Sequence, residues 1–237
     1  MTDSLHDLAP STSARSDVVR RAELTRRDRD AMFALYTTYF ATTDRLAFER
    51  DLAEKEWVIL LCDDDGTIEG FSTLMRMRVG EATVFFSGDT IVARHRWNTL
   101  DLPRLWARHV FAEADDNTYW FLISSGYRTY RYLPLFFRDF YPRDVTLKPL
   151  LDAIASAKFG DAYDPRTGVI RLATPAPLRE GISDPELRMS NPHVRFFVEA
   201  NPGHANGDEL ACLVRVDVGN LTAAGLRMLN TSTSVRR

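Results

Sequence analysis

The segment from residue 57 to 92 constrains the fold most, because it contains three strand-like runs in succession. An unbroken apolar run at 57–62 leads into an Asp-Gly turn at 63–67, and a long second run follows at 68–78. An Asp-Gly pair between two apolar runs is a strong local signal for a β-hairpin. A Gly-Glu turn then opens a third run at 82–92. The pattern predicts three consecutive antiparallel strands.

The rest of the chain alternates between helical and strand periodicity. The run Tyr119-Trp120-Phe121-Leu122-Ile123 has almost no polar face, which predicts a central strand. An aromatic segment at 127–140, bent near Pro134, predicts a helix after it. The remaining predicted elements are a strand at 18–21, helices at 25–40, from 43, at 101–114 and at 147–159, and a terminal hairpin with strands at 193–199 and 209–216.

These elements predict an α/β (α+β) fold with a central mixed, mostly antiparallel sheet flanked by helices on both faces. We expect a single domain at 17–220, with an insertion at about 143–192. A disordered tail at 1–16 and a C-terminal tail at 221–237 would flank it.

Composition narrows the class of protein. The 237 residues are 45% hydrophobic and 27% charged, as in ordinary globular proteins. A net charge of -3 gives no case for binding nucleic acid or a membrane surface. The polar N-terminus does not resemble a signal peptide, and no apolar run approaches the roughly 18 residues of a transmembrane segment. Cys62 and Cys212 lie in apolar runs and are expected to be buried thiols, so we predict a cytoplasmic protein.

The predicted order of elements resembles the GNAT superfamily of acyl-CoA N-acyltransferases over about residues 17–218. Among its members, long-chain N-acyl amino acid synthases are similar in size. The resemblance rests on element order, so what it implies about function is an expectation by analogy. It implies an acyltransferase that moves an acyl group from a thioester donor, acyl-CoA or an acyl carrier protein, to a small-molecule amine by direct attack. It implies no tightly bound cofactor.

In this superfamily a loop after the fourth strand binds coenzyme A through backbone N–H groups at the start of the next helix. Arg94 matches the first position of that motif, whereas Trp97 and Thr99 stand where glycine or another small residue belongs. Glycine permits a close backbone approach that tryptophan does not. The resemblance assigns donor binding to Ile91, Val92, Arg94, His95, Arg96, Trp97, Asn98, Thr99 and Ser124.

The basic residues of this loop, with Arg104 and Arg108 in the following helix, admit two interpretations. They either clamp phosphate through charge-assisted bonds or form a solvated basic face.

Amide formation from a thioester needs a base for the amine, an acid for the leaving thiolate and a donor for the oxyanion. The resemblance places the base and the oxyanion donor at residues 87–90, with Asp89 as the base, and places the acid at Tyr132. For Asp89 the alternative is a turn carboxylate bonded to local N–H groups, and for Tyr132 it is a core aromatic. The aromatic residues around these positions form either a normal core or an acyl-chain tunnel between diverging fourth and fifth strands.

Other chemistries lack their signatures. No histidine has the partner spacing of a metal site, and no Walker loop, dinucleotide fingerprint or Gly-x-Ser-x-Gly elbow occurs. Two further functions stay open: a non-catalytic module that senses an acyl ligand, and an interaction subunit whose aromatic helix is a protein interface. The sequence also leaves open whether the chain forms a homodimer.

Overall fold

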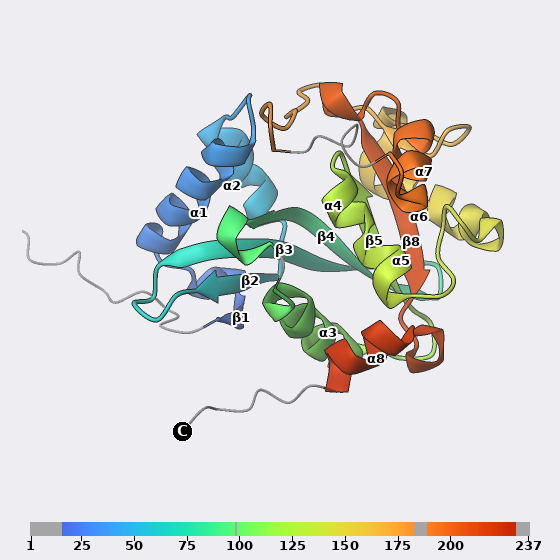
Figure 1. The fold of residues 1–237 in the computed structure, drawn as a ribbon, viewed down its shortest axis with the longest axis horizontal. Coiled ribbons are helices and arrows are strands. Elements are labelled where there is room, and N and C mark those ends of the chain that lie inside the picture. Colours follow the sequence, from blue (N-terminus) through green and yellow to red (C-terminus); the bar gives the residue numbers. More distant parts are fainter. Residues whose placement is uncertain (1–15, 98, 183–188, 231–237) are drawn as a thin grey trace, which may run out of the picture.

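The three strands predicted between residues 57 and 92 are present in the computed structural model, which describes residues 16–97, 99–182 and 189–230. They are β2 (Trp57–Cys62), β3 (Ile68–Val79) and β4 (Ala82–Val92), and each pairs antiparallel with the next. They are neighbours in an eight-stranded sheet whose order is β1-β2-β3-β4-β5-β8-β7-β6 (Figure 1).

The other strands extend this sheet on both sides. The pair β4–β5 is parallel and the other described pairs are antiparallel, so the fold is α+β with a mixed, mostly antiparallel sheet, as predicted. The predicted central strand β5 lies between β4 and β8. The strands beyond the first three are β1 (Asp17–Arg20), β5 (Thr118–Ser124), β6 (Tyr163–Asp164), β7 (Val169–Ile170) and β8 (Glu209–Arg215).

Strand β2 shows why the sheet is covered on both faces. All six of its residues are buried, and successive side chains of a strand point to opposite faces. Trp57, Ile59 and Leu61 join one hydrophobic cluster, while Val58 and Leu60 join another. A strand that is apolar at every position needs a layer of helices on each side.

The helices supply these two layers (Figure 1). One face packs against α3 (Asp101–Glu113), α4 (Tyr127–Tyr130), α5 (Tyr132–Phe136), α7 (Pro192–Ala200) and α8 (Ala223–Asn230). The other face packs against α1 (Arg26–Tyr39) and α2 (Arg45–Ala53) over one end of the sheet, and α6 (Lys148–Phe159) over the other.

Two helix starts follow from local capping chemistry. The hydroxyl of Thr25 accepts a hydrogen bond from the backbone N–H of Asp28, whose carboxylate accepts one from the N–H of Thr25. Asp44 caps α2 by accepting from the N–H groups of Leu46 and Ala47. Such caps satisfy backbone donors that have no partner inside the helix.

The predicted terminal hairpin is wrong in its first strand. Residues 193–199 lie in α7, which Asn191 caps and Pro192 opens. Val194 and Phe197, three residues apart, are its buried positions. The predicted second strand is present as β8, but it pairs with β5 and β7.

Residues 143–192, expected to be an insertion, contribute α6, β6 and β7, and the last two belong to the sheet. Part of the expected C-terminal tail forms α8, which packs on α3 and α5. The rest of that tail, from residue 231, and the N-terminal tail up to residue 15 lie outside the described residues.

The aromatic segment after β5 is broken earlier than predicted, at Arg131 between α4 and α5. Pro134 lies in the first turn of α5, where a missing N–H costs no helical hydrogen bond. Tyr127, Tyr130 and Phe136 point into the core. These three rings therefore belong to the core.

Cys62 and Cys212 are both buried and no disulfide joins them, as predicted. Within residues 16–97, 99–182 and 189–230, none of the helices has the length and apolar character that crossing a membrane requires.

Candidate functional site

Strands β4 and β5 diverge partway along their length, as predicted. Their parallel pairing runs from Thr83 opposite Thr118 to Ser87 opposite Leu122, although β4 continues to Val92. Near the same point the β3–β4 register shifts between Ser72 and Leu74, which marks a bulge. The divergence opens the sheet beside the C-terminal half of β4.

A cavity of about 870 Å³ occupies this opening, a volume suited to a small-molecule ligand. Its walls come from distant parts of the chain: α1, α2, β4, the loop before α3, α4, α5 and the start of β8. A segment at 172–182, which follows β7, closes another side. Backbone hydrogen bonds fasten that segment to the end of α1, from Ala41 N–H to Pro177 and from Arg179 N–H to Tyr39.

Gly88 occupies the bulge, where a larger residue would force neighbouring side chains to move. A Cβ atom at this position would lie 2.7 Å from Oγ1 of Thr73 and 2.9 Å from Cε of Lys55. The Lys55 side chain is fully buried and donates to Oδ1 of Asp51 at 2.6 Å. A buried ammonium group therefore lies directly beneath the bulge.

Asp89, the predicted base, lines the cavity immediately after the bulge. The pKa of its carboxyl is raised to about 7: burial is the largest cause, the charge of Asp51 acts in the same direction, and the Lys55 ammonium partly offsets both. A carboxyl with a pKa near neutrality can both accept and release a proton at physiological pH.

Glu209 is a second carboxyl at the cavity and was not predicted from the sequence. It is the first residue of β8, and the β5–β8 pairing places it beside the end of β5. Its pKa is raised to about 8: burial is the largest cause, the charge of Asp89 acts in the same direction, and hydrogen bonds from Ser125 act against both. The one signal for it in the sequence was an acidic residue at the start of an apolar run.

Two tyrosines accompany these carboxyls. Tyr132, the predicted acid, lines the cavity from α5, and burial raises its pKa above the usual value. Tyr36 lines it from α1, and burial together with the charges of Asp89 and Asp51 raises its pKa. Both hydroxyls keep their protons at neutral pH and serve as hydrogen-bond donors.

The predicted donor-binding loop lies only partly at the cavity. Its cavity-lining residues are Ile91, Val92, Arg96, Trp97 and Thr99. Arg94 instead donates to the carbonyl of Gly181 at 2.8 Å, and the His95 ring lies 2.8 Å from the carboxylate of Glu69. Asn98 lies outside the described residues.

Several basic side chains in and after this loop form ion pairs with neighbouring carboxylates. Arg96 forms ion pairs with Glu69 at 3.6 Å and with Asp101 at 3.3 Å. Arg104 also faces Asp101, at 4.0 Å. Of this predicted basic cluster, Arg96 is the member that lines the cavity. Arg128 and Arg131 line it as well; the close spacing of arginine and aromatic residues in their segment was compatible with an anionic or acyl ligand or with inward stacking.

Trp97 forms part of the cavity wall and leaves the space open. Its indole N–H donates to the carbonyl of Val92 at 2.6 Å, which folds the ring back against β4. The guanidinium carbon of Arg128 lies 4.0 Å from the centre of that ring. This contact between Trp97 and Arg128 connects the loop before α3 to α4, and it places the Arg128 guanidinium at the cavity wall.

Ser124 lines the cavity at the end of β5, as predicted. Its hydroxyl donates to the carbonyl of Gly126 at 2.6 Å, so it shapes the turn into α4. In the part of the chain that the structure describes, no group of three or more histidine, cysteine or acidic side chains converges on a point suited to a metal ion.

No protein-family model matches this chain, and a search of curated proteins finds no match. Its function therefore has to be inferred from the chemistry of the cavity.

Proposed function

We propose that the chain is a GNAT-like acyltransferase that moves an acyl group from a thioester to an amine. The single observation that carries the proposal is the divergence of β4 from β5 beside a carboxyl whose pKa is about 7. The order of elements from β1 to α5, which keeps its resemblance to the GNAT superfamily although the predicted terminal hairpin is not formed, supports the same assignment. The donor is coenzyme A or an acyl carrier protein, which share a pantetheine thioester arm.

The distribution of charge around the cavity supports one orientation of the two substrates. Arg96, Arg128 and Arg131 lie along the loop and the α4–α5 segment, where they suit the phosphates of the donor. Asp89 and Glu209 lie on the strands, where they suit a cationic amine. The thioester would then lie between the two groups.

In the proposed reaction the Asp89 carboxylate accepts one proton from the ammonium group, and the freed amine nitrogen attacks the thioester carbon. That nitrogen then releases its second proton, which replaces the one that Tyr132 gives up. Backbone N–H groups near Gly88 stabilise the oxyanion, and the C–S bond then breaks. Tyr132 donates a proton to the departing thiolate, so the products are an amide and a free thiol. Glu209, with the higher pKa, stays largely protonated at neutral pH and helps to hold the amine.

The test uses acetyl-CoA and S-acetyl-pantetheine, the part that both donors share, with a panel of amines. We expect acetyl-CoA to raise the melting temperature and free thiol to appear with at least one amine. Asp89→Asn is expected to lower kcat by roughly 10²–10⁴-fold while the thermal shift persists. Asp64→Asn, on an exposed turn, is the matched control. Failure of both thioesters to bind would overturn the proposal.

A non-catalytic acyl sensor is the second candidate. The observation that favours it is the ion pairing of Arg96 with Glu69 and Asp101, which leaves the loop less charge for a phosphate. A sensor would show the thermal shift without thiol release from any amine. Asp89→Asn would then change binding alone.

A further inference from the structure

The buried ammonium group of Lys55, in the loop after α2, has no role in packing that an apolar side chain could not fill. This side chain has no exposed surface, and it donates to the carboxylate of Asp51 at 2.6 Å and to the backbone carbonyl of the same residue at 3.1 Å. The ammonium also lies 5.6 Å from the centre of the Phe86 ring. Taking an ammonium group out of water is costly, and an apolar residue of similar size often stabilises a fold as well as a buried ion pair does. The charge of Lys55 therefore points to a function.

The Gly88 bulge of β4 lies directly against this lysine. A Cβ atom at Gly88 would lie 2.9 Å from Cε of Lys55 and 3.5 Å from its Nζ. The β3–β4 register shifts at the same place, between Ser72 and Leu74. A bulge changes the direction of the side chains around it, and the residue that follows this one is Asp89. The position of Asp89 therefore depends on how the bulge is supported.

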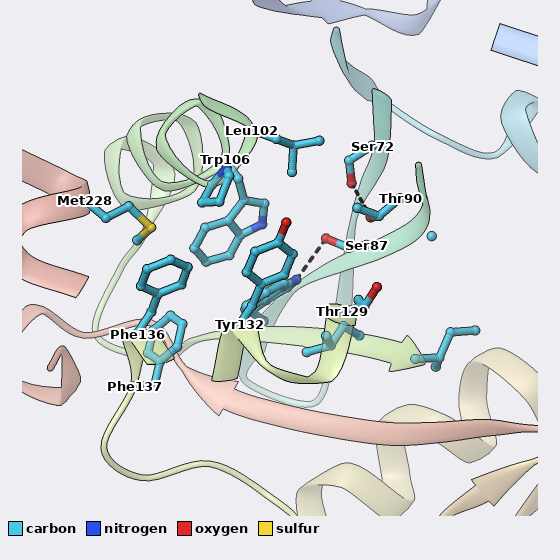
Figure 2. Close-up of a pocket in the computed structure, with 15 residues that line it drawn as sticks. Ser72, Ser87, Thr90, Leu102, Trp106, Thr129, Tyr132, Phe136, Phe137 and Met228 are labelled. Carbon is cyan, nitrogen blue, oxygen red and sulfur yellow. Dashed lines mark hydrogen bonds between the residues drawn. The ribbon is translucent and has the colours of Figure 1, made fainter. Parts of the chain in front are cut away.

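Side-chain hydrogen bonds fasten β4 before and after the bulge on the other face of the sheet. The Trp120 indole N–H donates to the Ser87 hydroxyl at 2.9 Å, and the Ser72 and Thr90 hydroxyls lie 2.7 Å apart (Figure 2). Figure 2 shows both pairs on the side of the sheet that carries α3. Lys55 supports the strand from the opposite side, so the bulge is held from both faces.

The titratable groups that act on the Asp89 carboxyl come from several elements. They are Asp51 on α2, Lys55 after α2, Tyr36 on α1 and Glu209 at the start of β8. Burial and the charge of Asp51 raise the pKa of Asp89, whereas Lys55, the cation of this group, lowers it. Without the ammonium, these carboxyl groups would face one another in a buried setting, and Asp89 would hold its proton more tightly.

Because Lys55 is fully buried, it acts through its neighbours and does not touch a substrate. We propose that Lys55 is a positioning residue for the acyl transfer: held by Asp51, its ammonium supports the bulge and favours the ionised form of Asp89 that accepts a proton from the amine. The inference rests on the proposed function. It gives the buried charge a task that an apolar side chain of the same size could not perform.

The first test follows the titration of Asp89 and needs no substrate. Protein isotope-labelled at its aspartate carboxyl groups is titrated by NMR from about pH 4 to about pH 10, and Asp89→Asn identifies the signal. The natural protein should titrate at about 7. Lys55→Met keeps the length of the side chain without its charge and should raise the midpoint by about one pH unit. Asp51→Asn removes a carboxylate and should lower the midpoint by a similar amount.

These opposite directions separate the proposed role from a structural one. If Lys55 only filled space, its replacement would let water reach the carboxyl, and the midpoint would fall in both variants. An unchanged or lower midpoint in Lys55→Met would therefore overturn the inference, and so would an unchanged or higher one in Asp51→Asn. Circular dichroism confirms folding. Lys55→Gln, which is neutral and keeps a donor for Asp51, replaces Lys55→Met if that variant does not fold.

Lys158→Met is the matched control for the titration. Its ammonium also lies 5.6 Å from the centre of the Phe86 ring, but it comes from α6 and pairs with Glu54. The Asp89 midpoint should move clearly less in this variant than in Lys55→Met. An equal rise in both would mean that any nearby positive charge has the same effect, which would contradict a specific role for Lys55.

The second test is the pH dependence of kcat/KM with the thioester and amine that the natural protein uses. Lys55→Met should lower kcat/KM roughly tenfold at about pH 6 and leave it nearly unchanged at about pH 9, where Asp89 is ionised in both proteins. A uniform loss at every pH would show that Lys55 serves the fold alone.

The two proposals fail in different ways. If no thioester binds, the proposed acyl transfer falls, and the role of Lys55 in that reaction falls with it, whereas the titration still shows whether Lys55 acts on Asp89. If thioesters bind and react but the Asp89 midpoint does not rise in Lys55→Met, the acyltransferase stands and only the role of Lys55 is lost.

Discussion

At the scale of single residues, two carboxyl groups define the chemistry of the cavity. Asp89 and Glu209 are far apart in the sequence, yet the charge of Asp89 raises the pKa of Glu209. The charges that act on Asp89 come from Lys55, in the loop after α2, and from Asp51 on α2, and Tyr36 on α1 lies close enough to feel the charge of Asp89. Burial is the largest cause of the raised pKa of both carboxyl groups, so ionising either group costs free energy in the folded protein.

This cost predicts a pH-dependent stability. The pKa of Glu209 rises from 4.5 to about 8 on folding, so the folded state holds a proton that the unfolded chain has already released between these values. The contribution of this proton to the free energy of unfolding is fully present below pH 4.5 and is lost as the pH rises through 8. Glu209→Gln should therefore raise the free energy of unfolding at pH 9 by roughly 1–3 kcal/mol and leave it nearly unchanged at pH 4.

Urea denaturation at the two pH values measures this effect, with Asp64→Asn as the exposed control. A variant that is less stable than the natural protein at pH 9 would show that the Glu209 carboxylate is stabilised in the fold.

At the scale of elements, α8 has a larger role than its terminal position suggests. It packs against α3 and α5, and its buried Met228 joins the same hydrophobic cluster as the α3 residues. Gly225 allows this close approach, because a Cβ atom there would collide with the carbonyl oxygen of Phe136. The helix α8 is therefore packed closely against α5.

Gly225→Ala is expected to destabilise the protein by roughly 1–3 kcal/mol, because the backbone of α5 has to move to accommodate the methyl group. Thermal unfolding measures the loss. Gly219→Ala is the matched control, since its added methyl meets only the flexible side chain of Asp217 at 3.2 Å or more. Equal stability of the two variants would mean that α8 is not held tightly against α5.

At the scale of the whole molecule, one sheet carries all three hydrophobic clusters. Strand β4 contributes Phe85 to the cluster beneath α3 and Phe86 to the cluster beneath α6, while Ile91 joins the cluster beneath α1. A strand shared in this way couples the clusters, so that none is independent of the others.

We therefore expect a single cooperative unfolding transition in urea. Tryptophan fluorescence reports mainly on the face with α3, where Trp57, Trp106 and Trp120 lie, while circular dichroism reports on all helices. The midpoints should coincide within error. Separate midpoints would show that the part containing α6 unfolds on its own.

The sequence by itself determined the local features. The Asp-Gly turn determined the β2–β3 hairpin, the Thr25 cap determined the start of α1, and the apolar run 119–123 determined a central strand. Each signal is complete within a few residues, because turn geometry, capping and side-chain periodicity act over short distances along the chain.

The tertiary structure alone decided which distant segments meet. Residues 193–199 became a helix, β8 paired with β5 and β7, and only that pairing brought Glu209 to the cavity that Asp89 lines. Tertiary contacts also decided which loop residues reach the cavity. Arg94 and His95 contact partners outside it, whereas Arg96 and Trp97 line it. The physical reason is that such contacts depend on packing between segments, on which local propensity has little influence.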